Sequence, residues 1–125
     1  MQQILVTAAT GNVGASLVEA LQKKNMNFTA ATRNEEKARD KLGSAVDTVF
    51  MDYEQPESLG SALNGHDILF LSGASSMPHA EQLLIPMVEK AQKHNIDHIV
   101  FIATYPKLAK AVKESGIDYT GIAPN

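Results

Sequence analysis

Cysteine and tryptophan are absent from this 125-residue chain, and no long apolar run occurs in it. Without cysteine there is no disulfide framework, which is typical of a cytoplasmic protein. A membrane span takes about 20 consecutive apolar residues, so we expect no membrane partner. Basic residues are not in excess either, since the formal net charge is −3. Nucleic-acid binding usually needs a basic face, so we also expect no nucleic-acid partner.

Short apolar runs alternate with helical patterns along the whole sequence. That alternation is typical of βαβ units and predicts a parallel sheet covered on both faces. We therefore predict an α/β fold, a doubly wound parallel sheet in a single domain over residues 1–125. The six predicted strands are Gln3–Thr7, Asn27–Thr32, Thr48–Met51, Ile68–Ser72, His98–Ile102 and Tyr119–Ile122.

Five helices are predicted between these strands. Capping residues bracket three of them, namely Asn34 and Gly43, Pro56 and Gly65, and Pro106 and Gly116. The first helix begins near Asn12, and its predicted sheet-facing stripe consists of Val13, Leu17, Ala20 and Leu21. A fourth helix is predicted from Pro78 to His94. Pro86 inside it removes a hydrogen bond, so we expect a kink or a break there.

A strand that ends in a loop of small residues, Ile4–Gly14, is the most informative motif. The amide groups of Asn12, Val13 and Gly14 open the following helix, where they can bind an anion such as a pyrophosphate. The dinucleotide pattern places glycine at positions 8, 11 and 14, but position 8 is Ala8. If position 8 needs a positive φ, the alanine costs about 1–2 kcal/mol. If it needs only small size, the cost is low.

The ends of the second and third predicted strands carry two candidate cofactor-binding residues. Arg33 lies 19 residues beyond Gly14, and a cation at this place favours the 2′-phosphate of NADP over the 2′-hydroxyl of NAD. Asp52 lies at the carboxyl edge, where it can accept a hydrogen bond from adenine. The alternatives are that Arg33 is a solvated neighbour of a helix cap and that Asp52 is a turn carboxylate.

Weaker candidates follow the fourth and fifth predicted strands. Ser72 and Gly73 are small enough to leave room for the nicotinamide ribose, although a plain turn has the same composition. Thr104 and Tyr105 are candidate catalytic hydroxyls on the basis of position alone. The four histidines fit no metal-site spacing, and we predict no metal site.

Several motifs together resemble one family. TAATGNVG, the strand end TRN, the MDY turn, the strand IVFIAT and the terminal SGIDYTGIAPN are similar to the NmrA-like group of atypical short-chain dehydrogenase/reductase proteins. That group includes NADPH-dependent quinone reductases and redox-sensing regulators. The resemblance covers nearly the whole chain. It implies a Rossmann fold with strand order 3-2-1-4-5-6, and NADP bound by the turn of Thr10, Gly11, Asn12 and Val13, by Arg33, by the Asp52 region and by the loop from Ser72.

Departures from the family pattern qualify what the resemblance implies. Ala8 replaces the first glycine, and Ala123 stands where an arginine commonly precedes Pro-Asn. The family's long loop after the fifth strand is here reduced to Tyr105, between Thr104 and Pro106. Family members also continue into a lobe that closes over substrate. We expect a cofactor half with the substrate lobe absent.

Three functions are compatible with this pattern. The preferred one is an NADP(H)-binding domain of an NADPH-dependent oxidoreductase, acting on a quinone or small carbonyl with weak or no turnover in this short form. A second is a non-catalytic module that senses NADP(H) redox state, and a third is an engineered fold that has lost cofactor binding. The surface left by the absent lobe predicts a homo-oligomer.

Overall fold

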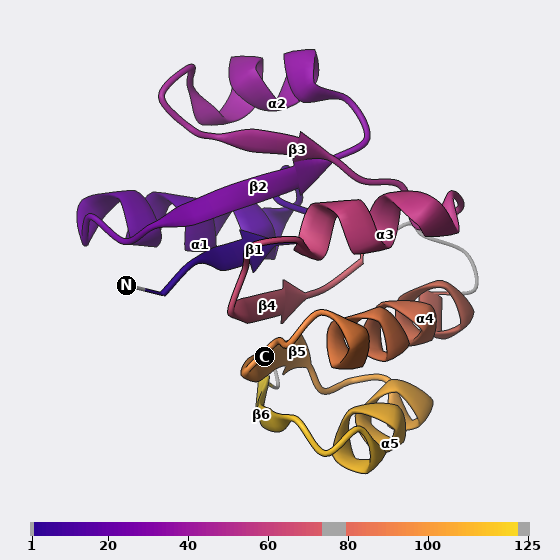
Figure 1. Cartoon of the computed structure of the whole chain (residues 1–125). Coiled ribbons are helices and arrows are strands. Elements are labelled where there is room, and N and C mark those ends of the chain that lie inside the picture. The colour runs from indigo at the N-terminus through magenta and orange to yellow at the C-terminus, as the bar shows by residue number, and fades with distance from the viewer. Residues whose placement is uncertain (1, 74–79, 123–125) are drawn as a thin grey trace.

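The computed structural model describes residues 2–73 and 80–122, in which strands and helices alternate (Figure 1). The strands are β1 (Ile4–Val6), β2 (Phe28–Thr32), β3 (Thr48–Phe50), β4 (Ile68–Leu71), β5 (His98–Ile102) and β6 (Asp118–Ile122). The helices are α1 (Asn12–Lys23), α2 (Glu35–Leu42), α3 (Pro56–Leu63), α4 (Ala80–Lys93) and α5 (Pro106–Glu114). The predicted helix start at Pro78 and the departure at Ala123 lie outside the described residues.

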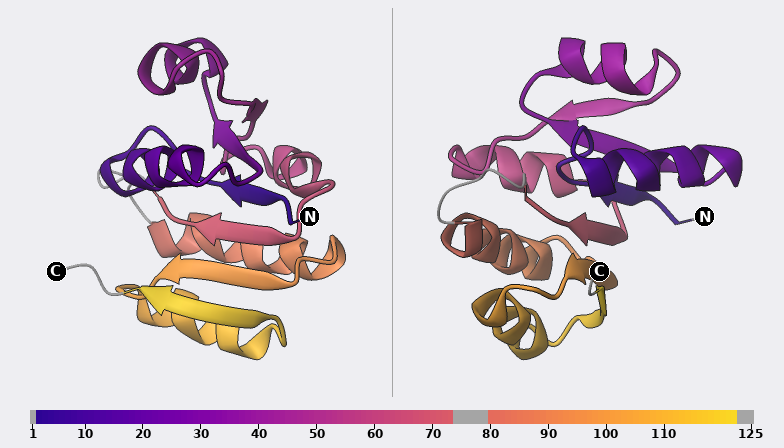
Figure 2. Two further views of the ribbon diagram at one scale, coloured as in Figure 1. Left: turned by 90° about the vertical axis from the view of Figure 1, so that its left-hand side faces the viewer. Right: turned by 180° about the vertical axis from the view of Figure 1, so that it is seen from behind.

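All six strands form one parallel sheet in the order β3-β2-β1-β4-β5-β6, which confirms the predicted fold and strand order. Figure 2 shows the twist of this sheet, with the arrows of β4, β5 and β6 pointing the same way. The chain reverses its direction of winding between β1 and β4, which are hydrogen-bonded neighbours. Loops on the two sides of such a switch point diverge, and ligands of open α/β sheets bind in the crevice between them.

Successive side chains of the central strands enter two different apolar cores. On β1, Leu5 belongs to the core beneath α3, α4 and α5, whereas Ile4 and Val6 belong to the core beneath α1 and α2. All three residues are buried. Burial on both faces explains why the central strands are nearly continuous apolar runs rather than alternating ones.

Local signals set most helix ends where the sequence predicts them. The Asn34 side chain accepts a hydrogen bond from the Lys37 amide (3.0 Å) and caps α2. Gly43 ends that helix with φ at 101°, a conformation that glycine adopts without strain. Pro56 and Pro106 stand at the first turns of α3 and α5. The strand ends differ from the predictions by at most one residue.

The predicted sheet-facing stripe of α1 is partly wrong. Val13 and Ala20 are exposed, and the buried residues of α1 are Gly14, Val18 and Leu21. The helix is rotated by about one residue because Gly14, which has no side chain, allows its face to approach the loop closely. The true stripe therefore begins with a glycine, which hydrophobic patterning does not score.

Of the kink or break expected at Pro86, the break does not occur, and the kink stays a prediction. A single helix runs from Ala80 to Lys93 through Pro86. Its face carries Leu84, Met87, Val88 and Ala91, all buried in the core shared with α3 and α5. This packing stabilises the helix on both sides of the proline and compensates for the hydrogen bond that proline cannot donate.

Candidate functional site

A cleft of about 960 Å³ opens at the carboxyl edge of the sheet. Its walls come from the β1–α1 loop, the end of β2 with the start of α2, the β3–α3 loop and the first turn of α4. This volume is at the upper end of the range for small-molecule and cofactor sites. The cleft lies on the β1-to-β3 side of the switch point, where a doubly wound fold binds nucleotides.

The loop between β1 and α1 forms one wall of the cleft, with Ala8, Ala9, Thr10 and Gly11 lining it. The Gly11 amide donates a hydrogen bond to the Ala8 carbonyl oxygen (3.0 Å), which closes a tight turn. Gly11 is also the N-cap of α1, and within the described chain no side chain caps that helix. The first amides of α1 are therefore available to an anion.

Ala8 adopts a left-handed conformation with φ at 49°. This observation decides between the two alternatives for position 8, because the turn requires a positive φ and not only a small side chain. The cost of alanine in that region is about 1–2 kcal/mol. The departure from glycine is consequently a strain within the loop itself.

Gly14 is required by close packing and not by its own φ. A Cβ at this position would lie 2.2 Å from the Ala8 carbonyl oxygen and 2.9 Å from the Ala9 Cα. Both atoms are backbone, so neither can move without displacing the loop. Gly14 is buried and allows α1 to pack closely against the β1–α1 loop, whereas its neighbours Asn12 and Val13 are exposed on the first turn of α1.

Three cations line the opposite wall of the cleft, namely Arg33, Lys37 and Lys41. Arg33 follows β2, as predicted. Lys37 and Lys41 lie one turn apart on α2, and the Lys41 ammonium donates a hydrogen bond to the Thr10 carbonyl oxygen across the cleft. Neither lysine is predicted from the sequence. Their i,i+4 spacing places both on one face of α2, but the sequence does not indicate that this face lines the cleft.

Asp52 lines the cleft and also organises its own turn. Its Oδ1 accepts a hydrogen bond from the Glu54 amide (2.9 Å), and its Oδ2 accepts one from the Gln55 side chain (3.3 Å). The alternative of a turn carboxylate is thus realised. An ionised carboxylate has about four acceptor positions, so each oxygen retains capacity for a ligand.

Ser72 and Gly73 follow β4, and within the described residues neither lines the cleft. Ser72 is buried and is hydrogen-bonded to Thr7, and the Tyr53 hydroxyl donates to its carbonyl oxygen (2.8 Å). Burial raises the pKa of the Tyr53 phenol well above its usual range. Tyr53 lines the cleft and packs against the larger core, and it was another residue missed from sequence.

The two candidate catalytic hydroxyls lie outside the cleft. Thr104 is exposed and Tyr105 is half-buried against the larger core, after β5. Within the described residues, neither lines the cleft formed by the loop and the three cations. Their proposed role therefore stays a prediction from strand position.

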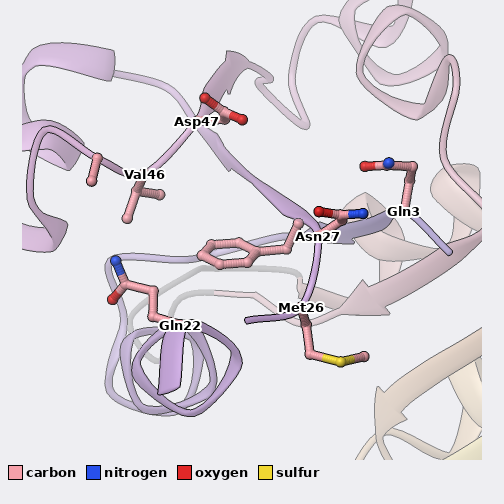
Figure 3. Close-up of a pocket in the computed structure, with 8 residues that line it drawn as sticks. Gln3, Gln22, Met26, Asn27, Val46 and Asp47 are labelled. Atoms are coloured by element: carbon pink, nitrogen blue, oxygen red, sulfur yellow. The ribbon is translucent and has the colours of Figure 1, made fainter. Parts of the chain in front are cut away.

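A smaller hollow of about 170 Å³ lies at the opposite, amino edge of the sheet (Figure 3). Its lining includes the amides of Gln3 and Gln22, the Met26 thioether and the Asp47 carboxylate. Across the described chain, no group of three or more His, Asp or Glu is placed to hold a metal ion. None of the helices in residues 2–73 and 80–122 has the length and apolar composition of a membrane span.

An uncapped helix N-terminus, a tight loop beside it and cations across a cleft at a switch point together define a dinucleotide-binding Rossmann domain. Residues 8–109 match the family model described as NAD(P)H-binding, and the chain belongs to that family.

Two relatives by sequence and one solved structure are similar to this chain. An NAD(P)H azoreductase from Xenophilus azovorans is 28% identical over 97% of the chain and 47% of its own length. The prestalk A differentiation protein A of Dictyostelium discoideum is 29% identical over 97% of the chain and 44% of its own length. The crystal structure of an NADPH-dependent quinone oxidoreductase from Escherichia coli, complexed with NADPH, superposes with a TM-score of 0.85 at 25% identity, over 96% of this chain and 48% of that one.

The chain spans about half the length of these relatives. Its match to the NAD(P)H-binding family, the azoreductase and the quinone oxidoreductase marks it as an NAD(P)H-binding, reductase-like domain.

Proposed function

We propose that this domain binds NADP(H) in preference to NAD(H). The observation that carries the proposal is the arrangement of Arg33, Lys37 and Lys41 along one wall of the cleft that the β1–α1 loop closes. A phosphate on the ribose 2′-oxygen is dianionic near neutral pH, and charge-assisted hydrogen bonds to it are stronger than neutral ones. The quinone oxidoreductase structure with bound NADPH supports the same choice by analogy.

Each part of the cofactor has a proposed set of contacts. The pyrophosphate lies over the first turn of α1, held by the amides of Asn12, Val13 and Gly14, with Ala8, Thr10 and Gly11 beside it. The 2′-phosphate lies near Arg33, and adenine lies near Asp52. The nicotinamide ribose lies near Ser72 and Gly73. When bound, the nicotinamide supplies hydride chemistry, while the chain's own groups orient it.

The proposed activity is that of an NADPH-dependent oxidoreductase with a quinone or a small carbonyl as acceptor. The reductase names of the azoreductase and the quinone oxidoreductase support it. Hydride transfer depends on holding donor and acceptor in near-attack geometry, which is worth roughly 7–11 kcal/mol. Thr104 and Tyr105, the two candidate catalytic residues, lie outside the cleft. We therefore expect this chain to reduce its acceptor slowly.

A titration of the purified chain with NADPH and then NADH tests this function. Binding of NADPH with a Kd below about 1 mM, and tighter than NADH, is the expected result. Quinone or azo-dye reduction above the cofactor-only rate then separates an oxidoreductase from a module that only senses NADP(H). Binding of neither cofactor would favour an engineered fold that has lost the site.

A second copy of the chain is the proposed protein partner. Val100 and Ile102 on β5 are only half-buried, and Ile122 on β6 is paired in register with Ile102 and exposed. They lie on the sheet face that α1 and α2 cover only over its other half. Light scattering at increasing protein concentration should show dimers, and a monomer throughout would contradict the proposal. The expected cytoplasmic location stays a prediction.

A further inference from the structure

A buried polar cluster joins the ends of three strands next to the cleft. Thr7 after β1 and Ser72 after β4 are 0% and 5% exposed. The Ser72 amide donates to Thr7 Oγ1 (2.8 Å), and the Tyr53 hydroxyl, which follows β3, donates to the Ser72 carbonyl oxygen (2.8 Å). Buried polar groups are costly when unpaired, so each bond restrains both of its partners.

Proton counting gives the Tyr53 hydroxyl a particular role. Thr7 Oγ1 lies 2.9 Å from the Phe70 carbonyl oxygen and 3.0 Å from that of Ser72. A hydroxyl has one proton and can donate it to only one of these carbonyls at a time. The Tyr53 hydroxyl is a second donor to the Ser72 carbonyl oxygen, and the Tyr53 side chain is also hydrogen-bonded to that of Thr7. The Ser72 carbonyl therefore stays bonded when Thr7 donates its proton elsewhere. A tyrosine hydroxyl is protonated at neutral pH, and burial raises the pKa of Tyr53 further.

The bond from Tyr53 to Ser72 spans the two halves of the fold. In the sheet, β2 and β1 separate β3 from β4. Tyr53 follows Asp52, on the side proposed for adenine, and Ser72 precedes Gly73, on the side proposed for the nicotinamide ribose. The Tyr53 hydroxyl thus links the side proposed for adenine to the backbone on the side proposed for the nicotinamide ribose.

We propose that Tyr53 is a positioning residue for the nicotinamide half of the cofactor. Its hydroxyl fixes the direction of the Ser72 carbonyl, and thereby the orientation of the Ser72–Gly73 peptide that faces the nicotinamide ribose. This inference rests on the proposed function. Tyr53 acts through the backbone of β4 and not by contact with the reacting carbon.

The test compares a whole cofactor with its adenine half. NADPH reaches both parts of the cleft, whereas 2′,5′-ADP reaches only the part next to Arg33, Asp52 and the β1–α1 loop. In the Tyr53→Phe variant, the Kd for NADPH should rise about 5- to 10-fold, as expected for one hydrogen bond, while that for 2′,5′-ADP stays within about twofold. The change in nicotinamide fluorescence on binding should shrink in parallel. Tyr119→Phe is the matched control, since Tyr119 is 42% exposed on β6 and packs against Phe101.

A measurement without ligand supports the same comparison. The Gly73 amide resonance in a ¹⁵N NMR spectrum should shift in Tyr53→Phe and stay in place in Tyr119→Phe, because of these two tyrosines Tyr53 is the one bonded to the peptide before Gly73. Equal weakening of both ligands would overturn the proposal, as would unchanged binding of NADPH or an unmoved Gly73 resonance. If the unsubstituted chain binds neither ligand, the proposed function fails, and the role of Tyr53 fails with it.

Discussion

Ala8 carries backbone strain in the β1–α1 loop, which is proposed to bind the pyrophosphate. Replacing Ala8 with glycine should raise the free energy of unfolding by about 1 kcal/mol. Glycine has no Cβ, so it adopts the left-handed conformation at φ 49° without steric strain. Urea denaturation of both proteins measures this change. We also expect tighter NADPH binding, since Ala8 lines the cleft. A less stable Ala8→Gly protein would contradict the account of the strain, and an unchanged Kd would show that the Cβ never obstructs the phosphate.

Gly14, in the first turn of α1, leaves no room for a side chain. The Gly14→Ala variant should lose about 3 kcal/mol or more of stability, because its Cβ meets rigid backbone at 2.2 Å. Gly60→Ala is a matched control within α3, where the new Cβ meets only the tip of the His94 side chain at 3.0 Å. Its clash and its gain in helix propensity should nearly cancel. Thermal unfolding compares the two, and similar losses would show that close packing at Gly14 is not special.

At the scale of elements, one carboxylate joins two helices. Glu81 in the first turn of α4 accepts hydrogen bonds from the Lys107 amide (2.6 Å) and the Leu108 amide (3.2 Å), and so caps α5. Because the carboxylate also lies at the positive end of the α5 dipole, Glu81→Ala should cost about 1–2 kcal/mol. Glu89→Ala, exposed on the same helix, should change stability by less than about 0.5 kcal/mol. Urea denaturation at one salt concentration checks both, and equal effects would exclude a capping role.

Elements whose signals are local were the ones predictable from sequence. Asn34 with its capping oxygen, Gly43, and the apolar runs of β1 and β4 depend on neighbouring residues or on burial alone. The phase of α1 was not predictable, because Gly14 is buried without contributing hydrophobicity. Continuity through Pro86 depended on packing between α4 and its neighbours, which no local rule contains.

Parts of the site that depend on distant pairs were missed for a related reason. Arg33 is recognisable by its spacing from Gly14. Lys37 and Lys41 enter the cleft only because of how α2 is oriented on the sheet. The bond from Tyr53 to Ser72 crosses two intervening strands, so no sequence spacing indicates it. The assignment of individual residues to parts of the cofactor stays a prediction.

For the molecule as a whole, the central claim is that a cationic wall facing the β1–α1 loop selects NADP(H). Arg33→Gln removes the predicted phosphate ligand, and Arg39→Gln removes an equal charge from an exposed position of α2 that does not line the cleft. Comparing the two separates a specific contact from the general effect of net charge.

Isothermal titration calorimetry of the unsubstituted chain and both variants, giving the Kd for NADPH and for NADH, tests this claim most directly. We predict that the unsubstituted chain and Arg39→Gln bind NADPH at least about tenfold more tightly than NADH, a difference of about 1.4 kcal/mol. In Arg33→Gln, NADPH binding should weaken to near the affinity for NADH, with NADH itself little changed. Equal affinities for the two cofactors in the unsubstituted chain, or a preference that survives Arg33→Gln, would contradict it.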